Sequence, residues 1–161
     1  MTFTMKDPLN TQRLVAGLGS PHGDDQLGWL VIDELLRSRI PGVAVRKLAT
    51  PHELLDHLQD VAELIVCDAA AGGTVGQISR YIWPDLPEAL GPRTSSHHSG
   101  LRITLELARF LFPNLGSPQV WTITGTCWEK LANATPAALI AVPILAEEIR
   151  HALASGPLDE A

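Results

Sequence analysis

The chain is 161 residues long, a length that fits one domain with its own buried core. Hydrophobic residues make up 45% of it, and its formal net charge is −6 without a cluster of Lys and Arg. This balance argues against nucleic acid or an anionic membrane as a partner, because phosphate groups are bound by local positive charge. We predict a single domain over residues 1–161, in which residues 1–12 form a flexible N-terminal arm.

The sequence shows no signal for export or membrane insertion. Residues 1–12 lack an apolar stretch, and no apolar run approaches the roughly 20 residues that cross a bilayer. Cys67 and Cys127 are far apart and have neither disulfide-framework nor metal-binding spacing. We therefore expect a cytoplasmic protein with no membrane partner.

Strands and helices are predicted to alternate along the chain. Apolar runs predict strands, helical spacing of apolar residues predicts helices, and Thr50-Pro51-His52-Glu53 has the form of a capping box. Ser99 is the expected cap of the third helix, and Pro143 is expected to kink the last. The predicted strands are 13–19, 43–48, 62–67, 76–83 and 119–124, and the predicted helices are 27–39, 51–57, 100–112 and 136–153.

This alternation is typical of βαβ units, whose parallel strands are covered by helices on both faces. We predict an α/β fold, a three-layer α/β/α sandwich around a mostly parallel twisted sheet of about five strands. Ligands of such sheets bind outside the carboxyl ends of the strands, near a switch in strand order.

Polar residues that can do chemistry follow three of the predicted strands. Asp24 and Asp25 lie in the loop after the first strand, Asp68 at the tip of the third, and His97 and His98 in the loop after the fourth. Clustered carboxylates repel one another unless a cation or a shared proton compensates. Two carboxylates and an imidazole suit nickel, zinc, manganese or iron.

Each of these residues also has a purely structural interpretation. Asp is a favoured helix N-cap, which is the role we expect for Asp24, and Asp68 can be a turn residue at a strand end. A lone histidine is more often structural than a ligand, and Cys67 fits a small core residue better than a nucleophile. The paired histidines gain weight only from their place at the predicted functional edge.

Two other classes of protein fit the sequence poorly. Gly17-x-Gly19 after a strand suggests a dinucleotide fingerprint, but the next glycine is misplaced and the two acids that follow would repel a pyrophosphate. A serine hydrolase would need a nucleophile elbow, and the sequence contains no Gly-x-Ser-x-Gly.

Three segments resemble the nickel–iron hydrogenase maturation endopeptidases, in that family's order and approximate spacing. Residues 17–28 (GLGSPHGDDQLG) resemble its opening Gly-x-Gly-Asn…Asp-Asp/Glu-Gly-x-Gly motif. Residues 64–69 (LIVCDA) are similar to its strand-plus-aspartate segment, and residues 95–101 (SSHHSGL) to its Ser-x-His-x-x-(Gly/Ser)-Leu segment.

The resemblance implies an endopeptidase that removes the C-terminal extension of a hydrogenase large-subunit precursor after nickel insertion. It implies that Asp25, Asp68 and His97 are both the metal ligands and the catalytic residues. The nickel is carried by the substrate, and zinc or cadmium is expected to substitute in vitro.

The sequence departs from the family pattern at several positions. The first loop is one residue shorter, Ser20 stands where Asn is typical, and Gln26 replaces a common glycine. Leu48-Ala49-Thr50 stands where many members have Asp-Gly-Gly-Thr or Asp-Cys-Gly-Thr, so an acid often found near the cleft is missing.

The residues leave the chemical step and two rival functions open. Attack on the peptide bond can use metal polarisation or a metal-activated water, or a water activated by Asp24 or Asp25 as general base. A nickel-binding maturation chaperone that does not cleave, and a metal-dependent hydrolase of small substrates, are the alternatives. The hydrogenase served, the cleavage site and the oligomeric state are not encoded in these motifs.

Overall fold

The computed structural model describes residues 12–87, 90 and 97–155, and the side chains of residues 97–99 lie outside that description. Residues 1–11 of the predicted arm also lie outside it, while Gln12 opens the first strand. The elements are β1 (Gln12–Leu18), η1 (Gly23–Gln26), α1 (Leu27–Arg37), β2 (Val43–Leu48), η2 (Pro51–His57), β3 (Val61–Ala70), β4 (Ile78–Ile82), α2 (His97–Leu111), β5 (Gln119–Thr124) and α3 (Pro136–Ala154).

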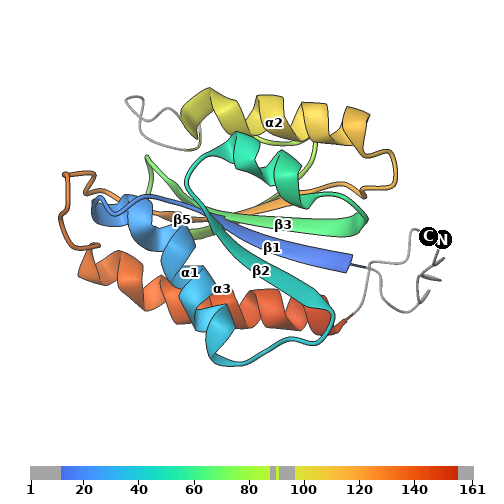
Figure 1. Cartoon of the computed structure of the whole chain (residues 1–161). Helices are drawn as coiled ribbons and strands as arrows, with labels where there is room; N and C mark the ends of the chain where they lie inside the picture. The colour runs from blue at the N-terminus through green and yellow to red at the C-terminus, as the bar shows by residue number, and fades with distance from the viewer. Residues whose placement is uncertain (1–11, 88–89, 91–96, 156–161) are drawn as a thin grey trace.

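The five strands form one sheet in the order β2-β1-β3-β5-β4. β2, β1, β3 and β5 are parallel, and β4 runs antiparallel to β5 at one edge. α1 and α3 cover one face of the sheet, and α2 and η2 cover the other (Figure 1). The predicted three-layer α/β/α sandwich with a mostly parallel sheet is confirmed.

Alternation along the strands divides the core into two layers. In β1, Val15 packs in the layer beneath α1 and α3, whereas Leu14, Ala16 and Leu18 pack in the layer beneath α2 and η2. The side chains of these residues are at most 2% exposed. Burial on both faces explains why the strands read as continuous apolar runs.

The strand order creates a switch point between β1 and β3. The chain leaves β1 through η1 and α1 to reach β2 on one side, and it returns through η2 to β3 on the other side of β1. Connections that diverge in this way leave a crevice at the carboxyl ends of the two central strands. We call this end of the sheet the carboxyl edge.

Several predicted boundaries differ from the structure. η2 is a 3-10 helix, although its capping box between Thr50 and Glu53 is present as predicted. α2 begins at His97, so Ser99 lies inside the helix and its prediction as the cap is wrong. β3 continues to Ala70, which places Asp68 two residues before the end of the strand and not at its tip.

Basic side chains lie on both edge strands of the sheet. Arg46 and Lys47 of β2 are exposed, and the Lys47 ammonium lies 2.5 Å from the Asp33 carboxylate of α1. On β4, the Arg80 guanidinium stacks 4.7 Å from the ring centroid of Trp121. In the part of the chain that the structure describes, no helix is long and apolar enough to span a bilayer.

Candidate functional site

The elements that carry the predicted site residues meet at the carboxyl edge. Asp25 lies in η1, directly after β1, and Asp68 lies in the last third of β3, the neighbouring strand. α2 runs back from this edge: a Cβ added at its Gly100 would lie 3.4 Å from Cγ of Pro51, the residue that opens η2 after β2. The backbone of His97, three residues earlier, therefore starts α2 at the same end of the sheet.

Asp68 is a buried carboxyl group on the α2 face of the sheet. Its side chain is 5% exposed, and its Oδ1 accepts a hydrogen bond of 2.8 Å from the N–H of Ala69. Burial raises the pKa of Asp68 well above its ordinary value; the Ala69 N–H opposes this, and the negative charge of Asp25 adds to it. Ionised Asp68 therefore needs a compensating cation.

Asp25 is the natural second member of this site. Its side chain is only partly buried, and its carboxylate is near enough to Asp68 to shift the pKa of that residue. A proton on Asp68 or a divalent cation shared with Asp25 can relieve both the repulsion and the desolvation penalty of such a pair. The fold therefore brings Asp25 and Asp68 to the same end of the sheet, and their sharing of one metal ion stays a prediction.

The complete trio of Asp25, Asp68 and His97 remains a prediction. The described residues contain no group of three His, Cys, Asp or Glu side chains arranged to hold a metal ion. The imidazole of His97 lies outside that description, so the structure gives the place of its backbone and not of its ligand atoms.

Asp24 has a different structural role from the one predicted. It makes no N-cap hydrogen bond to α1; its fully buried carboxylate accepts bonds from the loop after β5. Oδ2 accepts from the N–H groups of Thr126 (2.7 Å) and Cys127 (2.9 Å) and from Oγ1 of Thr135 (2.6 Å), and Oδ1 accepts from N–H of Thr135 (2.6 Å).

These four bonds determine the ionisation of Asp24. Burial alone raises the pKa of this carboxyl, but the bonds from Cys127, Thr135 and Thr126 outweigh burial and lower the pKa below its ordinary value. A carboxylate with both oxygens occupied and a lowered pKa is a poor general base. Of the two acids considered for that role, the geometry disfavours Asp24.

Two glycines of the first motif are required by packing and not by a nucleotide. A Cβ on Gly17 would lie 2.4 Å from the carbonyl oxygen of Gly28, and a Cβ on Gly28 would lie 2.1 Å from that of Leu18 and 2.8 Å from that of Cys67. The start of α1 therefore rests directly on the backbones of β1 and β3. Close helix–strand packing of this kind accounts for the glycine spacing that superficially suggested a dinucleotide site.

Cys67 is fully buried in the core. Burial raises the pKa of its thiol, and the neighbouring Asp68 raises it further. The thiolate is therefore disfavoured, which agrees with the prediction of a core residue and not a nucleophile.

Thr122 is the partner of Asp68 in the register of β3 and β5, and both side chains face the α2 layer. Its buried Oγ1 has no hydrogen-bond partner among the described residues. Because an unpaired buried hydroxyl is costly, we expect Thr122→Val to leave the free energy of unfolding unchanged or to raise it by about 1 kcal/mol. Urea denaturation measures this. A clear loss of stability would contradict this expectation.

The fold and the paired acids define an α/β/α protein with an acidic site at its topological switch point. Solved structures with the same fold include hydrogenase maturation endopeptidases. The hydrogenase maturating endopeptidase HybD from E. coli has a TM-score of 0.77 and 21% identity, over 91% of this chain and 94% of its own. An endopeptidase from Escherichia coli gives 0.78 and 21%, over 91% and 95%.

A third match is the [NiFe] hydrogenase maturation protease HycI from Thermococcus kodakarensis KOD1, with a TM-score of 0.72 and 20% identity over 89% of this chain and 93% of its own. Neither a protein-family model nor a curated protein sequence matches the chain. The chain therefore has the fold of the hydrogenase maturation endopeptidases, as the three sequence segments predicted.

Proposed function

We propose that this chain is a cytoplasmic hydrogenase maturation endopeptidase. It removes the C-terminal extension of a nickel–iron hydrogenase large-subunit precursor once nickel has been inserted, and it recognises that nickel through Asp25, Asp68 and His97. The observation that carries the proposal is the buried acid Asp68, which lies within electrostatic range of Asp25 at the switch point of a sheet with this fold.

The electrostatics of the two acids support recognition of a metal-loaded substrate. Nickel held by the precursor would approach the carboxyl edge with open coordination positions, which Asp25, Asp68 and His97 would fill. Binding would relieve the penalty of ionising Asp68 at a buried position. A precursor without nickel would meet uncompensated carboxylates, and specificity is the difference between these two states.

For the chemical step, we propose that the water attacking the scissile peptide is activated at the nickel or by Asp25. Asp24 is set aside as the base because its oxygens are occupied by the loop after β5. The Leu48-Ala49-Thr50 segment has a structural role at the start of η2. The carboxylate of Glu53 accepts hydrogen bonds from the N–H groups of Ala49 (2.7 Å) and Thr50 (3.0 Å).

Metal titration of the chain alone tests the ligand set. We expect one nickel, zinc or cadmium ion to bind per chain, because Asp25, Asp68 and His97 would all coordinate the same ion through bonds of about 2 Å. Asp25→Asn and Asp68→Asn should each weaken binding by at least about 100-fold, since each removes a ligand charge. Calorimetry gives the affinities, and Asp33→Asn, a substitution on the outer side of α1, is the matched control. Binding that survives both site substitutions would refute the assignment.

Processing of a co-expressed precursor tests the reaction. Mass spectrometry should show a shortened large subunit in cells supplied with nickel and the full-length precursor in cells deprived of it. A bound but uncut precursor would favour the non-cleaving chaperone, and turnover of small substrates without a partner would favour the simple hydrolase. Cleavage at equal rate without nickel would remove the recognition step.

A further inference from the structure

We infer that Asp24 is a positioning residue for Asp25. Its buried carboxylate holds the loop between β5 and α3 (residues 125–135) against η1, and this loop in turn fixes the backbone that presents Asp25. The role of Asp25 in reading the metal rests on the proposed function, whereas the fixing of η1 by this loop does not.

Backbone and side-chain bonds tie η1 to the loop on both sides of Asp25. Before it, the N–H of Gly23 donates to the carbonyl oxygen of Ala132 (3.0 Å), and the N–H of Asp24 donates to that of Cys127 (2.6 Å). After it, Nε2 of Gln26 donates to the carbonyl oxygen of Ala132 (2.9 Å). These bonds come in addition to the four that the Asp24 carboxylate accepts.

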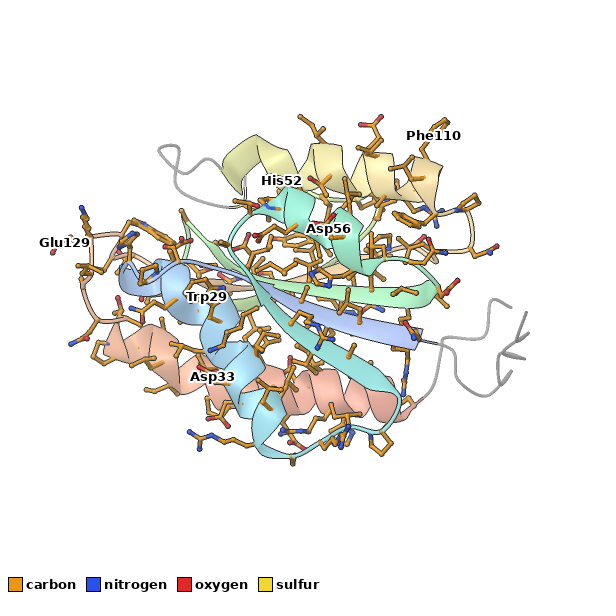
Figure 2. The ribbon with its side chains drawn as sticks, viewed as in Figure 1. Trp29, Asp33, His52, Asp56, Phe110 and Glu129 are labelled. Atoms are coloured by element: carbon orange, nitrogen blue, oxygen red, sulfur yellow. The ribbon has the colours of Figure 1, made fainter. Side chains whose placement is uncertain are left out.

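The entry to η1 is tied to the same loop. Nδ1 of His22 accepts a bond of 3.0 Å from the N–H of Leu131, a residue with a φ of 57°. A non-glycine residue in this left-handed region needs its surroundings to hold it there. Figure 2 shows Glu129 of this loop at the end of the molecule where α1 begins.

The two segments also leave no space between them. A Cβ on Gly125 would lie 2.4 Å from Cβ of Asp24, and a Cβ on Gly23, whose φ is +56°, would lie 2.4 Å from the carbonyl oxygen of Cys127. The contact therefore requires glycine on both sides, so η1 and the loop form one packed unit.

A metal ligand on η1 needs this support. A four-residue 3-10 helix has too few internal bonds to hold its own geometry. Ligand groups must be held within about 0.5 Å of their working positions, which short elements achieve only through neighbouring structure. The Asp24 carboxylate, with more bonds than any other side chain in this unit, supplies that structure.

Thr135 offers the sharpest test, because its hydroxyl is one donor to Asp24 and can be removed without changing the side-chain shape. Thr135→Val deletes that bond, and Thr135→Ser keeps it. Ile149→Val, in the buried core of α3, is a matched destabilising control. Amide hydrogen exchange of Asp25, Thr126 and Cys127 measures local opening, and cadmium affinity of the chain alone measures the consequence for the site.

We expect exchange at these amides to accelerate about ten-fold or more in Thr135→Val and cadmium affinity to fall by a similar factor. Thr135→Ser should keep both the exchange rates and the cadmium affinity at their wild-type values. Ile149→Val should lower the global stability, but it should not accelerate exchange at these amides beyond that global effect, and it should leave the cadmium affinity unchanged. Unaltered exchange at Asp25 in Thr135→Val overturns the inference, as does faster exchange with full cadmium affinity. If the wild-type chain binds no metal and cuts no precursor, the proposed function fails, and the exchange measurement alone decides whether Asp24 positions the Asp25 backbone.

Discussion

Replacing His97 by alanine is expected to lower precursor processing by at least about 100-fold, equivalent to about 2.7 kcal/mol of lost transition-state stabilisation, while the chain stays folded. The imidazole is the one nitrogen ligand in the proposed set, and its backbone starts α2 at the edge where Asp25 and Asp68 lie. Processing assays with purified nickel-loaded precursor measure the rate, and thermal denaturation measures the fold.

His98→Ala is the control that distinguishes the two adjacent histidines. Successive helical residues are rotated by about 100°, so we expect only one of the pair to serve as ligand, and the resemblance selects His97. His52→Ala, an exposed histidine of η2, controls for loss of any imidazole near α2 (Figure 2). A His97→Ala chain that cuts the precursor at the wild-type rate would contradict the proposed ligand set.

Gly28→Ala is expected to cost at least about 3 kcal/mol of folding free energy, at the upper end of what overpacking causes. The added methyl would lie 2.1 Å from the carbonyl oxygen of Leu18 and 2.8 Å from that of Cys67, and backbone atoms of two central strands cannot move aside cheaply. Urea denaturation measures the loss of unfolding free energy if the variant folds. A variant that does not fold would show that overpacking costs more than the whole stability of the chain.

Gly100→Ala is the matched control for this substitution. It also adds one methyl to a helical glycine, but the new Cβ would be in ordinary contact with Pro51 at 3.4 Å or more. Helix propensity then favours alanine, so we expect stability to rise by up to about 1 kcal/mol. Equal stability changes for the two substitutions would show that close packing of α1 on the strands is not what requires Gly28.

The fold could be predicted from the sequence because its signals are local. The apolar runs of β2 and β5 gave the observed bounds, Val43–Leu48 and Gln119–Thr124, and the helical spacing after Gln26 gave the start of α1 at Leu27. The errors lie where no local signal exists. β3 runs past Cys67 because pairing with β5 continues through Asp68 to Ala70, a contact between distant segments.

The site was predictable only in part, for the same reason. Asp25 and Asp68 could be assigned to one edge because parallel strands place their carboxyl ends together. The role of Asp24 could not be found, since its partners lie 102 to 111 residues away and bind mainly through backbone N–H groups, which carry no residue signature. The last helix was predicted to start at Pro136, which it does, but the hydroxyl of its N-cap residue, Thr135, donates to Asp24 instead of capping the helix.

The cations on the two outermost strands have a consequence for how copies of the chain behave in concentrated solution. A strand at the border of a sheet offers free backbone groups to any other strand, and this is a common route to fibrous aggregates. Arg46 on β2 and Arg80 on β4 would face like charges if two copies aligned these borders. The repulsion therefore disfavours a continuous intermolecular sheet between copies of the chain.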